Sequence, residues 1–152
     1  MCCQNKSTIM RIVAVLLVVV LVVPTGVSAA AQPRASYYLS AYSAYVYLPG
    51  DGEVRVYFNV EGTDYMDELG TLRIELYEST DNVNWSGVKT FNHYTTSGML
   101  SYNDDYHSGY VSYDGVAGRY YKAYVCIWGG KDGDGDTRYF WTNSEKATLF
   151  AE

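Results

Sequence analysis

The sequence predicts an all-β protein: a single antiparallel β-sandwich of about seven strands behind an N-terminal signal peptide. Two observations support this fold class. Apolar and polar residues alternate with period two in several segments, which is the pattern of strands that bury one face. Glycine, aspartate and asparagine separate these segments at the short intervals typical of sandwiches. Beyond residue 31 no segment has an apolar stripe at helical spacing, and only 64–69 offers a single helical turn.

The first 31 residues have the layout of a secretory signal peptide. Lys6 and Arg11 form a positive start, an apolar run follows at 12–23, and small residues then offer cleavage sites after positions 29 to 31. The apolar run is shorter than the roughly 20 residues that a membrane crossing needs. We therefore expect residues 32–152 to be secreted as one domain, without membrane insertion after cleavage. An uncleaved N-terminal anchor is the alternative.

Charge and cysteine content limit the binding partners and the disulfides that are expected for this domain. Once Lys6 and Arg11 leave with the signal peptide, 9 basic residues remain against 17 acidic ones, a net charge of −8. An acidic domain without a basic patch is not expected to bind nucleic acid. Cys126 is the only cysteine left, so the domain has no intramolecular disulfide and must rely on a hydrophobic core.

The strands are expected in segments that follow one another along the domain. The clearest is 53–61, EVRVYFNVE, in which four apolar residues alternate with polar ones. Residues 71–78 repeat the pattern, and a tyrosine-rich run at 37–48 ends at the turn sequence PGDG. In chain order the segments are 37–48, 53–61, 71–78, 89–94, 109–113, 120–128 and 137–143.

The facing of 120–128 decides which of its rings are exposed. Burying its even-numbered residues would place Lys122 in the core, which is costly without a partner. We therefore predict that the odd-numbered residues Tyr121, Ala123, Val125 and Ile127 face inward. The outward side chains are then Tyr120, Lys122, Tyr124, Cys126 and Trp128.

Two motifs resemble immunoglobulin and fibronectin type III domains. The run 115–121, GVAGRYY, precedes a long alternating strand as the tyrosine corner of those domains does. The run 74–85, IELYESTDNVNW, resembles a third strand followed by a polar turn and a tryptophan. Val56 and Phe58 stand where an antibody domain carries its first cysteine, so the resemblance concerns the architecture and not true immunoglobulins.

The domain also resembles small secreted proteins of Gram-positive bacteria, an uncharacterised group without an assigned activity. The likeness spans most of 37–148 and implies a secreted β-sandwich, with no catalytic residues to transfer. Its motifs are GDGEVRVYFNVEGT, MDELG, SGMLSYN, HSGYVSY and GGKDGDGDTR.

The stretch KDGDGDTRYFW places three aspartates at alternate positions before a strand. Asp132, Asp134 and Asp136 match the first, third and fifth ligands of an EF-hand loop. Thr137 and Asn143 stand where that loop needs glycine and glutamate, so an EF-hand is excluded. The preferred interpretation is a hairpin loop, because glycine and aspartate supply its positive φ angles. A looser calcium site on the three aspartates is the alternative, and no other cofactor is expected.

Aromatic residues are the second unusual feature, with 17 tyrosines and 3 tryptophans. Rows of exposed rings bind carbohydrate in many sandwiches, because the C–H faces of sugars stack on them. If the third, sixth and seventh strands share a sheet, their outer rings form such a row, and Tyr139 would extend it. A contiguous row marks an interaction site, although tyrosine is also simply favoured on half-exposed strands. The candidate ligand-binding residues are Tyr77, Trp85, Tyr120, Tyr124, Trp128 and Trp141.

Catalytic motifs do not occur in the sequence. His93 and His107 are its two histidines, and it contains neither a zinc-binding histidine pair nor a nucleophile elbow. Asp104, Asp105, His107 and Ser108, in the run DDYHS, lie too close along one strand to converge as a triad, since adjacent residues of a strand point in opposite directions.

The sequence therefore favours a secreted, non-enzymatic interaction module that works outside the cell. We expect its partner to be an extracellular protein or surface component, with a glycan bound on the aromatic rings as the alternative. Unpaired edge strands also offer a route to self-association. A small extracellular hydrolase is the second alternative, and paired carboxylates in a cleft would be its signature.

Overall fold

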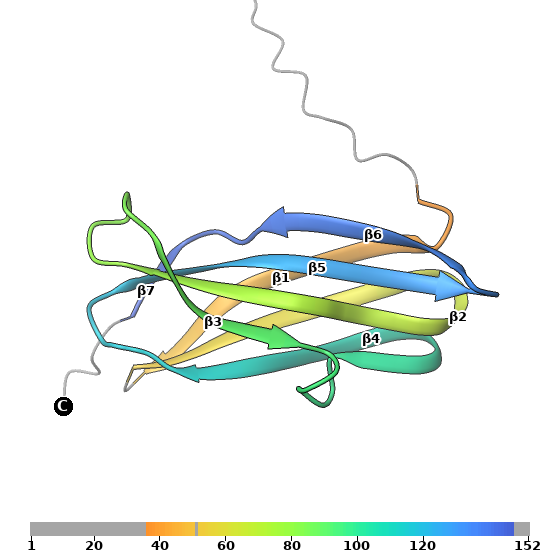
Figure 1. The fold of residues 1–152 in the computed structure, drawn as a ribbon, viewed down its shortest axis with the longest axis horizontal. Coiled ribbons are helices and arrows are strands. Elements are labelled where there is room, and N and C mark those ends of the chain that lie inside the picture. The colour runs from red at the N-terminus through yellow and green to blue at the C-terminus, as the bar shows by residue number, and fades with distance from the viewer. Residues whose placement is uncertain (1–35, 51, 148–152) are drawn as a thin grey trace, which may run out of the picture. The chain divides into compact units, whose positions relative to one another are not determined.

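The computed structural model describes residues 36–50 and 52–147, so the predicted signal peptide at 1–31 lies outside the described residues. Seven strands form one antiparallel sheet there, which confirms the all-β prediction (Figure 1). No helix among these residues is long and apolar enough to cross a membrane. The strands are β1 (Leu39–Gly50), β2 (Glu53–Ser79), β3 (Ser86–Asn92), β4 (Leu100–Asp114), β5 (Tyr120–Lys131), β6 (Asp134–Trp141) and β7 (Glu145–Lys146).

Strand β2 organises the sheet because it is 27 residues long and pairs with four other strands. Its first half lies between β1 and β4, and its second half lies between β3 and β5. Strands β6 and β7 pair with β5. In Figure 1 the second half of β2 and β5 lie in front of β1.

The sequence predicts two strands in β2, with a helical turn considered at 64–69, whereas the structure has one continuous strand. Met66 and Leu69 explain the difference. Both side chains are buried in the core, and the backbone at both positions pairs with β4. Tertiary pairing and burial therefore override the local preference, and the helical turn is wrong.

The sheet curls so that both halves of β2 contribute to one hydrophobic core. Alternation along the first half sends every second side chain into this core, as predicted. Burial of each large apolar side chain contributes about 1.5–3 kcal/mol. The β2 residues with at most 2% of their surface exposed include Val54, Val56, Phe58, Val60, Met66, Leu69, Ile74 and Leu76.

Strand β5 has the facing that the sequence predicts. Tyr121, Ala123, Val125 and Ile127 are fully buried, whereas Lys122 on the opposite side is partly exposed. Lys122 therefore keeps its charge at the surface. The prediction rests on this point, because burying the charge without a partner is costly.

Cys126 departs from this pattern, because it is predicted to be exposed and is only 5% exposed. It lies on the outer side of the sheet, opposite its cross-strand partner Tyr139 on β6. Burial raises the pKa of the Cys126 thiol. The thiolate is disfavoured, so Cys126 acts as a small packing residue.

Strand β4 is much longer than the predicted segment 109–113. Among the described strands it pairs only with β2, so it is an edge strand and most of its residues are at least partly exposed. A polar edge strand lacks the apolar alternation that reveals a strand in a sequence. The other predicted strands are shifted by a few residues at their ends.

Tyr121 ties the start of β5 to the turn before it. Its hydroxyl oxygen accepts a hydrogen bond from the Val116 backbone at 2.6 Å, and its hydroxyl group donates one to Glu78 at 2.7 Å. Arg119 forms an ion pair with the same carboxylate. Burial raises the pKa of Tyr121 to about 12, and the adjacent Glu78 charge acts in the same direction. These contacts hold Tyr121 on the inner side at the start of β5, and the facing of the following β5 residues alternates from there.

Candidate functional site

The three predicted metal ligands lie in the hairpin that joins β5 to β6. Lys131 pairs with Asp134, so the loop between them contains only two residues. Asp132 and Gly133 both have positive φ, 56° and 81°. Positive φ at both central positions identifies a type I′ turn, which matches the twist of the flanking strands. The hairpin interpretation is therefore confirmed.

The aspartates engage different parts of the chain. The Asp132 backbone donates to Asp67 at 2.7 Å, and Asp134 accepts from the backbone of the next residue at 2.8 Å. Asp136 accepts from the Tyr37 backbone at 3.2 Å and lies 3.6 Å from the Arg138 guanidinium. Over the described residues, no group of three or more acidic, histidine or cysteine side chains is arranged to hold a metal. The calcium alternative gains no support from this geometry.

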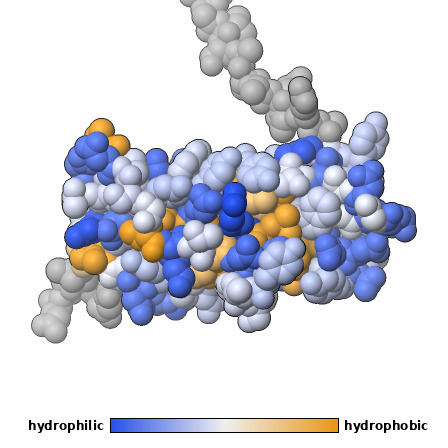
Figure 2. Space-filling model, viewed as in Figure 1, coloured by the Kyte–Doolittle hydropathy of each residue, from blue (hydrophilic) through white to orange (hydrophobic). Residues whose placement is uncertain are grey.

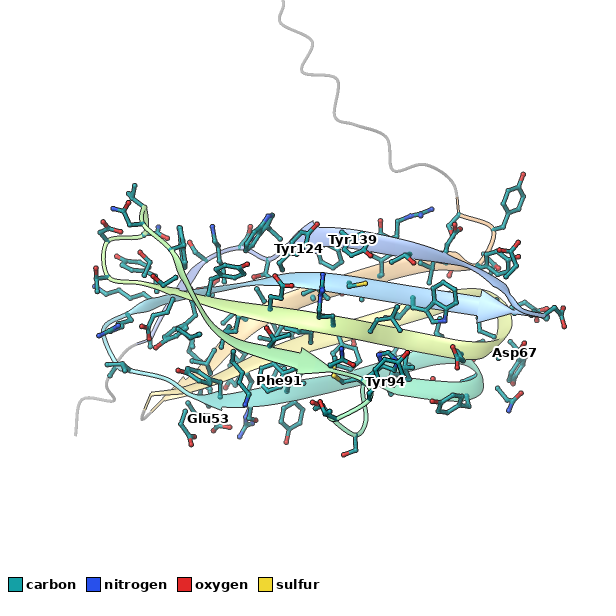
Figure 3. All side chains as sticks on the ribbon, viewed as in Figure 1. Glu53, Asp67, Phe91, Tyr94, Tyr124 and Tyr139 are labelled. Carbon is teal, nitrogen blue, oxygen red and sulfur yellow. The ribbon has the colours of Figure 1, made fainter. Side chains whose placement is uncertain are left out.

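Four of the six predicted ligand-binding residues gather on the outer side of the second half of β2, β5 and β6. Cross-strand pairing explains this, because Tyr77 lies opposite Lys122 and Tyr124 lies opposite Trp141. Figure 3 shows Tyr124 and Tyr139 side by side on β5 and β6. We call this cluster the aromatic face; its members are Tyr77, Trp85, Lys122, Tyr124, Tyr139 and Trp141.

The rings of the aromatic face pack against one another. Trp141 is central, with ring centroids 5.0 Å from Tyr77 and 4.9 Å from Tyr124. Tyr124 is in turn stacked on Tyr139 at 6.0 Å. Contacts of this kind contribute about 0.5–1.5 kcal/mol each beyond area burial. Even so, Trp141 and Tyr139 remain 49% and 54% exposed, so the rings are both ordered and accessible.

Lys122 lies between the two tryptophans of this face. Its ammonium nitrogen is 4.2 Å from the Trp85 ring centroid and 4.5 Å from that of Trp141. Cation–π attraction therefore joins the β3-side loop to β6. The sequence predicts that Lys122 faces outward, but it predicts no role for this residue. Its place between Tyr120 and Tyr124 on the same outward side of the strand was the available signal.

Trp85 is held in position by the loop that precedes it. Asp81 accepts hydrogen bonds from the Val83 backbone at 2.9 Å and from the Asn84 backbone and side chain at 2.8 and 2.7 Å. These donors, those of Asn84 first, hold the pKa of the Asp81 carboxyl group well below its usual range. Trp85 is half-buried, with its ring against Lys122.

Tyr120 and Trp128, the other two predicted ligand-binding residues, make their contacts at opposite ends of β5. The Trp128 indole N–H donates to Glu68 at 3.2 Å. Its ring lies so close to Gly135 that a Cβ there would come within 2.4 Å of it, so Trp128 covers the hairpin backbone. The Tyr120 ring contacts the Lys146 ammonium group at 5.3 Å.

A pocket of about 400 Å³ lies beside Trp128 and is lined by three carboxylates. Each of them accepts a hydrogen bond from the protein itself. The donors are the Asp132 backbone for Asp67, the indole for Glu68 and the following backbone amide for Asp134. The bonds of Asp67 and Glu68 hold β2 against the hairpin and β5, whereas the bond of Asp134 lies within β6.

The two histidines also have structural partners. A ring nitrogen of His93 lies 3.1 Å from the Leu72 carbonyl, and one of His107 lies 2.9 Å from the Gly98 carbonyl. A carbonyl only accepts, so the nitrogen that bonds it carries the proton. Each imidazole thus fixes a neighbouring backbone segment.

No family model matches the chain, and no curated protein matches it either. Among solved structures, it is similar to the crystal structure of Spo0M, a sporulation control protein from Bacillus subtilis. That similarity has a TM-score of 0.38 and 12% sequence identity, and it covers 66% of this chain and 47% of Spo0M. The matched region therefore spans less than half the length of that protein.

Proposed function

We propose that the protein is a secreted, non-enzymatic interaction module that binds an extracellular protein or cell-surface partner through the aromatic face. The observation that carries the proposal is the ordered, half-exposed cluster around Trp141 and Lys122. Tryptophan and tyrosine dominate the binding energy of protein interfaces, since they bury large areas at a small entropic cost. Figure 2 shows one side of the protein, on which hydrophobic patches lie among hydrophilic residues.

The ring contacts favour a protein over a glycan on this face. A sugar ring needs an open aromatic surface to stack on, but the Trp85 and Trp141 rings both contact the Lys122 ammonium group. Tyr77 additionally packs its ring against Trp141. A protein partner does not need to displace these contacts, because it can supply a carboxylate to Lys122 and apolar atoms to the exposed ring edges.

The architecture proposed for this module is a sandwich of the immunoglobulin or fibronectin type III type. Two groups of strands share the core: β1, β4 and the first half of β2, and then β3, β5, β6 and the second half of β2. The bond between the Tyr121 hydroxyl group and the Val116 backbone also has the form of a tyrosine corner. Both features support this proposal.

A photo-crosslinking experiment tests the binding site. A benzophenone amino acid replaces Tyr139 on the aromatic face or, as the matched control, Ser112 on β4, and the protein is irradiated on intact Gram-positive cells. We expect a discrete adduct from position 139 but not from 112, and its loss when Trp141→Ala is added. Equal labelling at both positions would contradict the proposal, and adducts between two copies would indicate self-association instead.

Secretion is tested separately by expressing the full chain in a Gram-positive host. We expect the protein in the culture medium to begin within one residue of Ala31, because the predicted cleavage sites follow positions 29 to 31. Full-length protein retained in the membrane fraction would show that residues 1–31 act as an uncleaved membrane anchor and not as a signal peptide.

A further inference from the structure

A second group of rings lies on the outer side of β1, the first half of β2 and β4. Tyr45 lies opposite Tyr57, and Tyr57 lies opposite Tyr110, so these three form a row across the strands. Tyr47 packs its edge on Tyr57, and Tyr106 follows on β4. We call these five residues the tyrosine face. The sequence predicts no role for them as a group.

The contacts of Tyr57 with its three neighbouring rings differ in geometry. Its ring is stacked on that of Tyr45, with the centroids 5.3 Å apart and the planes inclined by only 7°. The Tyr110 ring is equally near, at 5.1 Å, but is tilted by 32°. The Tyr47 ring meets Tyr57 edge-on, at 5.9 Å and 74°. Of the three contacts, only that of Tyr45 and Tyr57 therefore places two ring faces against each other.

Face-to-face stacking favours the oxidative coupling of two phenols. A phenol that loses one electron and its hydroxyl proton becomes a phenoxyl radical, with unpaired spin on the carbons ortho to the oxygen. The orbitals that hold this spin project perpendicular to the ring. Two stacked phenoxyl rings can therefore form a carbon–carbon bond between ortho carbons, whereas tilted or edge-on rings direct these orbitals past each other.

The stacked pair is accessible to an oxidant in solution. Tyr45 is 49% exposed, and Tyr57 is partly exposed. Sulfur side chains compete for oxidants, and in the described part of the chain these are Cys126, Met66 and Met99, each at most 5% exposed. Buried sulfur atoms therefore do not draw the oxidation away from the exposed rings.

The cation of the tyrosine face further distinguishes the two cross-strand neighbours of Tyr57. The Arg55 guanidinium carbon lies 5.2 Å from the Tyr110 ring centroid. A cation over a ring makes the loss of an electron from that ring less favourable, because the cation–π attraction is weakened. Glu53 pairs with Arg55 at 2.7 Å and reduces this effect. Over the described residues no cation lies over the Tyr45 ring, so charge and geometry both select Tyr45 as the coupling partner.

We propose that Tyr45 and Tyr57 form a modification site, at which a haem peroxidase and hydrogen peroxide join the two rings into an intramolecular dityrosine. Each ring gives one electron to the peroxidase and its hydroxyl proton to water, and the two radicals bond through one ortho carbon each. The hydrogens on these two carbons leave as protons, and protons from water restore both hydroxyl groups. The two electrons and two protons released overall reduce one hydrogen peroxide to two water molecules.

The product is a covalent staple between β1 and β2. Among the described strands β1 pairs only with β2, so it is an edge strand whose pairing can fray. A cross-link between positions 45 and 57 restricts the unfolded chain, as a disulfide does, and thereby stabilises the folded state. The inference uses no residue of the aromatic face and is independent of the proposed function.

Oxidation of the purified full chain with a haem peroxidase and hydrogen peroxide tests the inference. The monomer is isolated by size-exclusion chromatography, digested with trypsin and analysed by fluorescence and mass spectrometry. Trypsin cuts after Arg55, which separates the two tyrosines unless they are joined. We expect dityrosine fluorescence in the monomer and a joined pair of peptides, 35–55 with 56–73, that has lost two hydrogens. The thermal midpoint of the oxidised monomer should rise by at least about 4 °C.

Phenylalanine variants assign the bond, since they keep the stacked ring but cannot form a phenoxyl radical. Tyr45→Phe and Tyr57→Phe should each lose most of the dityrosine of the monomer and the whole rise in thermal midpoint. Tyr110→Phe, on the other side of Tyr57, is the matched control and should retain both. The inference is overturned if the oxidised monomer contains no dityrosine, if the bond forms only between two copies, or if Tyr45→Phe keeps the signal. A bond between Tyr57 and Tyr110 would also overturn it.

Discussion

The aromatic face and the tyrosine face are built by the same rule but offer different chemistry. Each places half-exposed rings on neighbouring strands, because cross-strand pairs bring side chains close together. The aromatic face contains Lys122, which has no carboxylate partner among the described residues, between two indole rings. The tyrosine face contains Arg55, whose charge Glu53 compensates, and small polar groups. The neighbours of the rings, more than the rings themselves, set the charge that each face presents.

Phe58→Ala is expected to have the largest effect, because it should disable both faces together. Phe58 is 1% exposed in the core that the two halves of β2 share, and its loss should reduce the unfolding free energy by about 3–5 kcal/mol. Urea unfolding measures this. Tyr57→Ala, one residue earlier on the outer side, is the matched control and should cost much less. Two separate unfolding transitions would show that the faces belong to independent units.

Raising the pH is expected to destabilise the common scaffold through Tyr121. Its pKa is about 12 in the folded protein and near 10 when unfolded, so the unfolded chain releases the proton first. The stabilisation is complete below pH 10 and is lost as the pH rises to 12, a change of about 2–3 kcal/mol. Unfolding of the protein and of Tyr121→Phe, compared across this range, measures it. Parallel curves for the two proteins would rule out the Tyr121 contribution.

Lys122→Met should alter the aromatic face alone. Removing the ammonium group from between Trp85 and Trp141 is expected to cost about 0.5–2 kcal/mol and to shift the tryptophan fluorescence. Lys146→Met, which removes the cation beside Tyr120, is the matched control and should leave the indole emission unaltered. An unchanged emission in Lys122→Met would mean that the cation does not hold the two indoles.

The smallest effect is expected at the acidic hairpin. Asp132→Asn should change the unfolding free energy by less than about 0.5 kcal/mol, because asparagine also suits a type I′ turn before glycine. Added calcium should leave the thermal midpoint of the protein unchanged. A calcium-dependent rise that disappears in Asp132→Asn would restore the metal site and set this hairpin beside the two faces as a third functional region.

The sequence by itself determined the all-β class, the facing of β5 and the hairpin after Lys131. Each depends on local chemistry: on alternation, on the cost of burying Lys122, and on the φ angles that Asp132 and Gly133 adopt. The candidate rings Tyr77, Tyr124 and Trp141 were also identified, since alternation alone puts them on outer sides.

Only the tertiary structure decided which of these side chains meet. It joined the two predicted strands of β2 through the buried Met66 and Leu69, and it placed Cys126 under Tyr139. It also separated Trp128 from Trp141 and aligned Tyr45, Tyr57 and Tyr110, which come from three strands. Strand register depends on long-range pairing, and period-two alternation specifies the face of a residue but not its cross-strand neighbour.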